Sequence, residues 1–226
     1  MSDDLAHLAA WLPSVGLALA PGTQLEPLGG GIANRNEAVM LTSGQQMIQA
    51  VLRRPPPGLL AAGASDMGRE ARVLAALAPH FPLAPRLIAA CDDPSVLGTP
   101  FLLLERRAGI AIAGTLPAGA GDGLALVETT LQAMAALHAL EAAAIGRGDL
   151  GKPEGFHARQ LKGWTARAHA VWPDGLPPAY AALIAALAAN VPAETGAPVL
   201  LHMDLKPDNL LVHPATMRPE AMIDWD

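Results

Sequence analysis

The sequence predicts an α+β fold in two lobes, with a five-stranded antiparallel sheet and one helix in residues 1–107 and a mainly helical lobe in residues 108–226. Strand-like runs separated by Gly-containing turns fill residues 23–54, which is the pattern of an antiparallel meander. Residues 108–121 are rich in Gly and Ala, and we interpret them as the hinge between the lobes. Beyond this hinge, apolar residues recur at the helical period over residues 124–138.

The first lobe opens with a short amphipathic helix over residues 3–12. Two strand-like runs within residues 23–41 then flank three consecutive glycines. A later helix has Ser65 or Asp66 as its N-cap, because a short side-chain oxygen accepts a hydrogen bond from a free N–H of the first turn. The remaining predicted elements are a strand at 46–54, a helix at 66–78 and strands at 86–93 and 101–107.

The second lobe is predicted to be built mainly from three helices. The first carries an apolar stripe at spacings of three and four residues, made of Leu124, Val127, Leu131, Met134 and His138. Two more helices are expected at residues 156–172 and 179–190. Three short strand-like pieces, VLLHMD, NLLV and AMIDW, close the sequence.

Composition excludes several classes of partner and site. The net charge is −6 with no basic run, which argues against nucleic acid because phosphate neutralisation needs clustered Lys and Arg. Cys91 is the single cysteine, so neither a disulfide framework nor a cysteine zinc site is expected. Prolines bound the uncharged stretch 175–193 and leave it too short for a membrane span. The acidic N-terminus lacks the basic start of a signal peptide, so we expect a cytoplasmic protein without a membrane partner.

The stretch HMDLKPDN, residues 202–209, places polar residues between two apolar strand-like runs. A further carboxylate, Asp224, ends another apolar strand, and two strands ending side by side would bring Asn209 and Asp224 together. Their oxygens suit Mg²⁺, whose coordination is completed by water and substrate phosphates. Asp204 would then orient or deprotonate an attacking hydroxyl, and Lys206 would place a positive charge on the transferring group.

An Asp, an Asn five residues later and a following strand-borne Asp form the catalytic pattern of protein kinases. The segment around Asp204 closely resembles the kinase catalytic loop. The alternative interpretation is a polar turn between two strands, with Asp208 and Asn209 as turn formers.

The first lobe contains residues that such a pattern requires for nucleotide phosphates. Gly29, Gly30 and Gly31 lie between two strands and would permit close backbone approach, although three glycines also make an ordinary flexible turn. Arg53 shares a pleat face with Val51 near the end of the third strand. These positions predict a nucleotide-binding surface on the sheet.

Glu70 lies on the apolar face of the predicted helix at 66–78, where a carboxylate requires a nearby cation. Arg53 is the natural partner, although a surface Arg and an unrelated helix-face Glu remain the alternative. Glu105, which closes the run FLLLE, is predicted to lie where the hinge backbone meets adenine.

Together these residues resemble the aminoglycoside phosphotransferase-like family of small-molecule kinases, from about residue 23 to the end. The similarity is greatest to the branch that includes the kinase-like domain fused to acyl-CoA dehydrogenases. The segments that carry it are VLRRPPPG, REARVLAAL, SVLGTPFLLLE, RQLKGW and IDWD.

The resemblance implies a bilobal protein-kinase-like fold that uses ATP and Mg²⁺. It implies that Asp204 is the catalytic base, that Asn209 and Asp224 bind Mg²⁺, and that Arg53 contacts nucleotide phosphates while Glu70 holds it. His202 and His138 also match family positions, and we interpret both as structural.

Three departures from the family pattern affect what is expected. Met203 replaces the usual Gly and would narrow the mouth of the site, and Lys206 with Pro207 is more typical of protein kinases. Family domains normally continue with several helices after the motif that ends here at Asp226, so the second lobe looks truncated. We therefore expect exposed apolar surface on the last two predicted helices, and either marginal stability or burial of that face in a homo-oligomer.

The sequence favours an ATP-dependent phosphotransferase that acts on a hydroxyl of a small molecule. The alternatives are a kinase-fold protein that binds nucleotide or a partner with little turnover, and a protein kinase. Against a protein kinase, no activation segment follows Asp224, and Asp-Trp-Asp replaces Asp-Phe-Gly. The resemblance to the acyl-CoA dehydrogenase branch implies a hydroxylated acyl or organic acid as acceptor in preference to an antibiotic. A cationic aminoglycoside would be favoured by an acidic lining, and the sequence shows no acidic cluster beyond the catalytic one.

Overall fold

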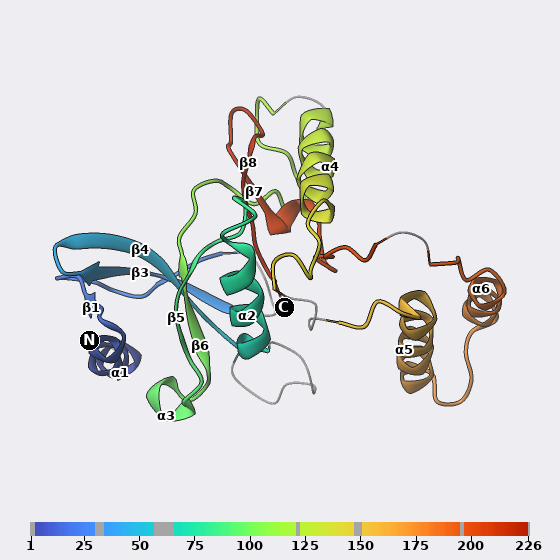
Figure 1. Ribbon diagram of the computed structural model, residues 1–226, viewed down its shortest axis with the longest axis horizontal. Coiled ribbons are helices and arrows are strands. Elements are labelled where there is room, and N and C mark those ends of the chain that lie inside the picture. Colours follow the sequence, from blue (N-terminus) through green and yellow to red (C-terminus); the bar gives the residue numbers. More distant parts are fainter. Residues whose placement is uncertain are drawn as a thin grey trace. The chain divides into compact units, whose positions relative to one another are not determined.

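The computed structural model describes residues 3–29, 34–56, 66–120, 123–146, 151–194 and 197–225 (Figure 1). The chain divides into two compact units. The first comprises Met1–Leu140 together with Leu200–Asp226, and the second comprises Glu141–Val199. The lobe boundary predicted after residue 107 lies inside the first unit and stays a prediction.

An antiparallel sheet forms the centre of the first unit, as predicted. Its strands run in the order β1-β3-β4-β6-β5, and β2 pairs with β3 beside this path. The strands are β1 (Ala18–Leu19), β2 (Glu26–Pro27), β3 (Arg35–Ser43), β4 (Gln46–Arg54), β5 (Leu87–Cys91) and β6 (Phe101–Glu105). The sheet has six strands, one more than the five that were predicted. The additional strand is β1, which has only two residues and is therefore too short to show a strand pattern in the sequence.

The β3–β4 hairpin sets the register of the candidate nucleotide residues. Ser43 pairs with Gln46, so only two residues form the turn, and the first of them, Gly44, has a φ of 58°. Such tight hairpin turns need a positive φ that glycine adopts without strain. From this turn the ladder continues to the pair Asn36 and Arg53, which fixes these two residues opposite each other.

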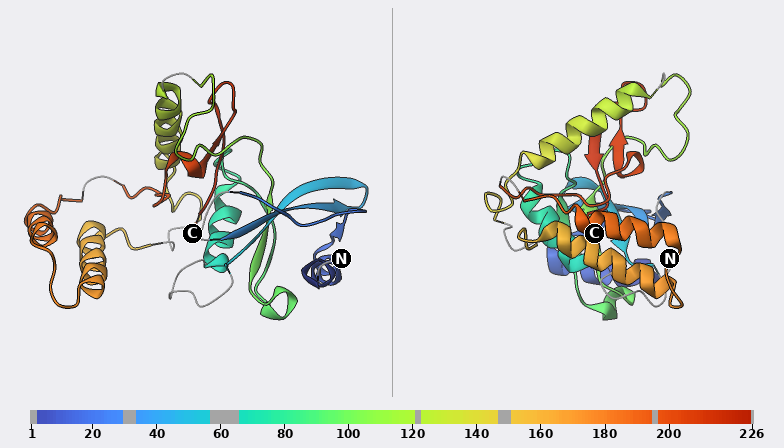
Figure 2. Two further views of the ribbon diagram at one scale, coloured as in Figure 1. Left: turned by 180° about the vertical axis from the view of Figure 1, so that it is seen from behind. Right: turned by 90° about the vertical axis from the view of Figure 1, so that its right-hand side faces the viewer.

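Helix α2 (Met67–Leu77) lies against β5 and β6 (Figures 1 and 2). It begins where Asp66 accepts a hydrogen bond from the Arg69 amide at 2.9 Å, which selects Asp66 as the predicted cap. Its buried face consists of Met67, Glu70, Ala71, Val73, Leu74 and Leu77. A carboxylate therefore lies within an otherwise apolar face, as the sequence predicted for Glu70.

The hydrophobic core of the sheet is completed by the N-terminal helix α1 (Asp3–Trp11). Leu8, Leu12, Leu52 and Phe101 are fully buried there, and Trp11 meets Phe101 edge to face with ring centroids 4.9 Å apart. The short helices η1 (Leu12–Val15) and α3 (Pro94–Leu97) border this cluster. The resulting core packs against β4, the strand that carries Arg53.

The first unit also contains α4 (Leu124–His138) and an antiparallel pair, β7 (Leu210–Val212) and β8 (Pro219–Met222), which follows the turn η2 (Pro207–Asn209). Helix α4 packs on β8. The predicted helix is present but the predicted buried stripe is wrong. Leu124, Val127 and Leu131 are 69%, 56% and 54% exposed, and the buried face consists of Leu126, Thr129, Ala133 and Leu137.

The start of the predicted hinge is held against this β-pair. Ile110 exchanges backbone hydrogen bonds with Val212 at 2.9 and 3.0 Å, and Arg107 Nη2 donates to the Glu220 carbonyl at 2.6 Å. A Cβ added at Gly109, whose φ is 106°, would lie 3.0 Å from the Val212 carbonyl oxygen. The close approach therefore requires glycine at this position.

The second unit contains the two helices α5 (Phe156–Val171) and α6 (Pro178–Ala189), which pack on each other. Glu194 caps α5 by accepting from the amides of Gly155 and Phe156 at 2.9 and 2.6 Å. Neither helix has a buried residue. The large exposed side chains of the two helices include Trp164, Val171, Tyr180, Leu183 and Leu187. Within the described ranges, none of the helices has the length and apolar character needed to cross a membrane.

Candidate active site

The predicted catalytic loop is closed by hydrogen bonds between its own residues. Asp204 Oδ2 accepts from Lys206 Nζ at 2.8 Å and from Asn209 Nδ2 at 3.0 Å. Asn209 Nδ2 also lies 2.9 Å from the Asp204 carbonyl oxygen, and the Asn209 amide donates to the Lys206 carbonyl. The structure therefore brings Asp204, Lys206 and Asn209 together, so the loop is an organised turn with a presented carboxylate.

Asp204 and Asn209 differ in their access to solvent. The Asp204 side chain is 59% exposed, whereas Asn209 is only 6% exposed. The hydrogen bond from Lys206 lowers the pKa of Asp204, so this carboxylate is ionised at neutral pH. Asn209 directs its amide nitrogen at Asp204, which leaves Oδ1 at the opposite end of the amide as the end that could meet a metal.

The β7–β8 pair brings Asn209 beside Ile223, the residue that precedes Asp224. Leu210 pairs with Met222, and the Ile223 amide donates to the Asn209 carbonyl at 2.9 Å. Asp224 then follows with a φ of 71°, a left-handed conformation that is uncommon for a residue other than Gly, Asn or Asp. The chain after β8 therefore turns the Asp224 side chain towards Arg53 on β4.

Arg53 links three elements of the site through its guanidinium. Nε donates to Glu70 Oε2 at 2.7 Å, Nη1 lies 3.4 Å from Asn36 Oδ1, and Nη2 donates to Asp224 Oδ1. Arg53 and Glu70 are 6% and 1% exposed, so the predicted pairing is present and is buried. Arg53 also holds Asp224, a contact that the sequence did not predict.

Of the other residues predicted to bind nucleotide, the structure describes Val51, Gly29 and Glu105. Val51 is half-buried on β4, on the same side of the strand as Arg53. Gly29 is exposed, and a Cβ there would meet nothing within 4 Å, while Gly30 and Gly31 lie outside the described residues. Glu105 ends β6 and turns its carboxylate to Arg86, whose backbone N and Nε lie 3.2 and 3.4 Å away. The adenine contact predicted at Glu105 stays a prediction.

Asn36 is a member of the site that the sequence reasoning missed. It accepts from Arg53 and pairs with it across β3 and β4. The register counted back from the Ser43–Gln46 turn would have identified it, because residues opposite each other on one face of a sheet interact.

The oxygen atoms at this site fit a magnesium ion that completes its shell with phosphate and water. Asn209 and Asp224 offer an amide oxygen and a carboxylate, which are the hard ligands that Mg²⁺ prefers. Among the described residues, no three His, Cys, Asp or Glu side chains form a group that could hold a metal by themselves. The residues present therefore suit a metal that arrives with phosphate oxygens.

His202 packs beneath the loop rather than in it. It is 5% exposed, its Nε2 donates to the Ile223 carbonyl at 2.9 Å, and its ring lies 4.5 Å from that of Trp225. Burial lowers its pKa, which the nearby carboxylates of Asp224 and Asp204 oppose without reversing. These contacts support the structural role predicted for this histidine.

Because His202 is neutral when buried, we expect a pH-dependent loss of stability. The unfolded chain takes up a proton near the ordinary histidine pKa of 6.5, whereas the folded chain does so only at lower pH. The contribution is therefore present above pH 6.5 and is lost as the pH falls towards the folded pKa. Melting temperatures measured across this range should fall less steeply for His202→Gln than for the wild type. The exposed His213→Gln variant serves as the control, and equal slopes in all three proteins would contradict the assignment.

Met203 has a φ of 70°, a conformation in which a side chain meets the following carbonyl. This is the position where the family pattern has Gly. We expect Met203→Gly to hold or raise the free energy of unfolding by up to about 1 kcal/mol, because the left-handed strain disappears. Met203→Val should lower it, because a β-branched side chain fits this region poorly. Chemical denaturation of the two variants checks the prediction, and a more stable Val variant would refute it.

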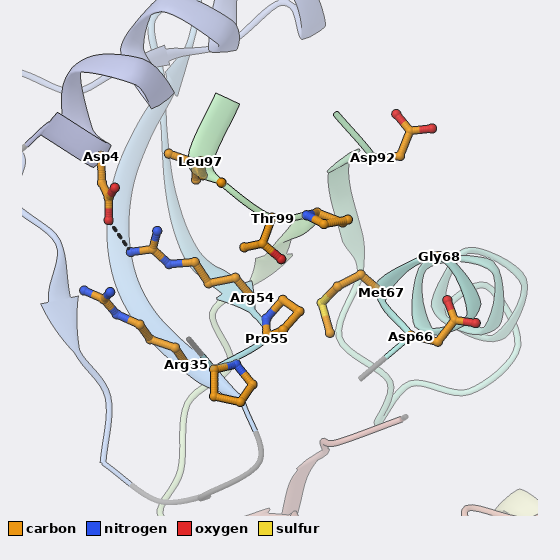
Figure 3. Close-up of a pocket in the computed structure, with 13 residues that line it drawn as sticks. Asp4, Arg35, Arg54, Pro55, Asp66, Met67, Gly68, Asp92, Leu97 and Thr99 are labelled. Atoms are coloured by element: carbon orange, nitrogen blue, oxygen red, sulfur yellow. Dashed lines mark hydrogen bonds and ion pairs between the residues drawn. The ribbon is translucent and has the colours of Figure 1, made fainter. Parts of the chain in front are cut away.

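A separate pocket of about 660 Å³ lies beside Arg54 (Figure 3). Arg54 follows Arg53 on β4 and points to the other face of the strand, where its Nη2 donates to Asp4 and Glu37 at 2.7 Å each. The side chains that close this pocket include Arg35, Pro55, Met67, Leu97 and Thr99. Among the described residues, none of those predicted for catalysis or nucleotide binding lines this pocket.

Comparison with known proteins agrees with this geometry. The Phosphotransferase enzyme family matches residues 24–226. A putative aminoglycoside phosphotransferase from Ralstonia eutropha superposes with a TM-score of 0.73 and 29% identity, over 97% of this chain and 64% of that one. A macrolide 2'-phosphotransferase from Brachybacterium faecium, at 23% identity and a TM-score of 0.64 over 96% of this chain and 70% of that one, shares the fold. These similarities confirm the predicted protein-kinase-like fold class.

Two curated relatives have longer chains. The probable acyl-CoA dehydrogenase IBR3 of Arabidopsis thaliana is 34% identical over 90% of this chain and 26% of its own. The human acyl-CoA dehydrogenase family member 11 is 33% identical over 78% of this chain and 23% of its own. The chain thus spans about a quarter of the length of these relatives. The match over residues 24–226 shows that the chain belongs to the Phosphotransferase enzyme family.

Proposed function

We propose that the chain is an ATP-dependent phosphotransferase that phosphorylates a hydroxyl group of a small molecule. The observation that carries the proposal is the convergence of Asp204, Asn209, Asp224 and the Arg53–Glu70 pair at one place in the first unit. These residues come from β4, α2, the catalytic loop and the segment after β8. A polar turn of purely structural origin would not require a buried arginine to reach Asp224.

Asp204 supplies the base in this proposal. Its ionised and exposed carboxylate accepts the proton of the acceptor hydroxyl, which orients the oxygen and increases its nucleophilicity. Asn209 fixes the direction of this carboxylate through its amide nitrogen, and the Lys206 ammonium lies 2.8 Å from it, where it would offset developing negative charge. The three side chains thus act on the acceptor side of the reaction.

Arg53 and the segment around Asp224 act on the nucleotide side. Arg53, held in place by Glu70, would contact the phosphates, while Asn209 and Asp224 would hold the magnesium ion. When bound, that ion would neutralise the negative charge of the phosphate oxygens. Positioning and electrostatics of this kind account for most of the catalysis in phosphoryl transfer.

A second candidate function is nucleotide or partner binding with little turnover. The bond between Arg53 and Asp224 favours it, because both groups are predicted to serve other partners during catalysis. A thermal-shift titration with ATP and magnesium tests the binding step that both candidates share. Measured turnover then separates them.

The decisive experiment is a screen of hydroxylated acyl compounds, organic acids and aminoglycosides, coupled to ADP release. We expect turnover with an acceptor from the first two groups, because the chain is similar to the kinase-like part of acyl-CoA dehydrogenase family members. The proposed activity would be excluded if ADP release did not depend on any acceptor. It would also be excluded if Asp204→Asn released ADP at the same rate as the wild type.

The proposal also includes a cellular location and an oligomeric state. The single cysteine supports a cytoplasmic location, and the net charge of −6 supports neither a nucleic-acid nor a membrane partner. The exposed apolar side chains of α5 and α6 support a homo-oligomer that buries them. Light scattering at several protein concentrations tests the oligomer.

A further inference from the structure

The bond between Arg53 and Asp224 joins a cation suited to nucleotide phosphates to a carboxylate suited to a metal ion. Arg53 spreads its donors over partners on separate elements, with Glu70 on α2, Asn36 on β3 and Asp224 after β8. Arg53 is nearly buried, and the Asp224 side chain is 26% exposed. A charge-assisted contact of this kind is stronger than a hydrogen bond between neutral groups, and in a partly buried setting salt screens it less.

Asp224 is aimed at Arg53 by its own backbone. The preceding residue, Ile223, donates its N–H to Asn209 and accepts from His202, both at 2.9 Å. The following residue, Trp225, donates its Nε1–H to the Met222 carbonyl at 2.8 Å. These three bonds over-determine the segment, which explains how Asp224 is held at a φ of 71°. The contact is therefore a built feature of the fold.

We propose that Arg53 is a positioning residue that makes nucleotide and metal binding interdependent, because its guanidinium holds the Asp224 carboxylate until nucleotide phosphates replace it. This inference rests on the proposed function. A carboxylate already neutralised by a guanidinium is a weak ligand for a hydrated dication, and that dication would be repelled by Arg53. Phosphates reverse both effects, because they attract Arg53 away from Asp224 and add oxygen ligands.

Arginine is required for this role because its nitrogens point in fixed, different directions. A lysine ammonium is a single point charge that cannot reach three separated partners at once. In Arg53→Lys, the shorter cation should stay with Glu70, which is 1% exposed and lies 2.7 Å from Arg53 Nε in the wild type. The conservative variant therefore keeps the buried pair and releases Asp224.

The first test measures binding of Mn²⁺, as a spectroscopic substitute for Mg²⁺, by electron paramagnetic resonance with and without ADP. Wild-type protein should bind Mn²⁺ weakly alone and much more tightly with ADP. Arg53→Lys should bind Mn²⁺ alone more tightly than wild type, by about 5- to 150-fold, the usual range of coupling between two sites. Arg54→Lys is the matched control, because Arg54 pairs with Asp4 and Glu37 on the other face of the same strand. It should behave as wild type.

The second test measures the reverse effect, with ADP titrated in the presence of a chelator. Asp224→Asn should bind metal-free ADP more tightly than wild type, because the Asp224 carboxylate no longer competes with the phosphates for Arg53. Asp208→Asn, an exposed neighbour on the catalytic loop, is its control. This arm does not depend on Arg53→Lys folding correctly.

The outcomes separate the two proposals. If wild-type protein binds neither ADP nor ADP with Mn²⁺, the proposed function fails and the inference fails with it. If wild type binds both ligands but Arg53→Lys and Asp224→Asn leave Mn²⁺ and metal-free ADP affinities unchanged, the interdependence alone is refuted. Tighter Mn²⁺ binding by Arg53→Lys and tighter ADP binding by Asp224→Asn, with unchanged controls, establish it.

Discussion

Replacing Asp204 with Asn is expected to lower kcat by about 10²–10⁴, the usual contribution of a general base. The variant keeps the size of the side chain and an oxygen that can accept from Lys206, but it cannot take up the hydroxyl proton. The melting temperature should stay close to that of the wild type, because the Asp204 side chain is 59% exposed. Turnover is measured by ADP release with the best acceptor, and stability by thermal denaturation.

Asp208 gives a matched control for Asp204. It lies on the same loop, is similarly exposed, and its carboxylate is 4.0 Å from Lys206. Asp208→Asn should therefore leave kcat within a factor of a few of wild type. Retention of near-normal turnover by Asp204→Asn, or equal losses in both variants, would show that the loop has no catalytic base at Asp204.

Replacing Asn209 with Ala is expected to remove the magnesium dependence of ATP binding and to destabilise the loop. The variant loses one of the two predicted metal ligands, and it also loses the bonds from Nδ2 to the backbone and side chain of Asp204. A buried hydrogen bond contributes about 1 kcal/mol, and one to a charged group contributes more. ATP titrations with and without magnesium, together with denaturant unfolding, measure the two effects separately.

Asn209→Asp distinguishes ligation from loop closure. It keeps oxygen ligands but loses the amide donor and puts a second carboxylate beside Asp204, so the magnesium response should survive while stability falls. If Asn209→Ala bound ATP with the wild-type magnesium dependence, Asn209 would be a structural residue and would not be a metal ligand.

Much of the site was predictable because its signals are local or obey sheet geometry. The five-residue spacing of Asp204 and Asn209 follows from one turn, and the strand pattern around Leu210 and Met222 brings Asp224 beside it. The pairing of Arg53 with Glu70 followed from a charge on an otherwise apolar helical face. In the last case a buried polar group required a partner, and few residues could supply it.

The buried face of α4 shows where such reasoning fails. Leu124, Val127 and Leu131 recur at helical spacing, but so do Leu126 and Leu137 with the small residues between them. Periodicity identifies the helix, yet it does not choose between two apolar stripes when most of the circumference is apolar. That choice is made by packing on β8, a contact with residues far along the chain.

The bond between Arg53 and Asp224 was also beyond the sequence. The two residues are 171 positions apart, and each had a different predicted partner. Only the left-handed turn at Asp224 and the neighbouring bonds of Ile223 direct that carboxylate at the sheet. Such long-range geometry has no local signature.

The close contact of Gly109 and Ile110 with β7 has a mechanical consequence. The chain leaving the sheet after β6 is fastened to Val212, three positions beyond Asn209, so a displacement of one is transmitted to the other. The segment at Gly109 and Ile110 is therefore fixed to β7 and does not act as a free hinge. Gly109→Ala would force a methyl group against the Val212 carbonyl and would disrupt this contact.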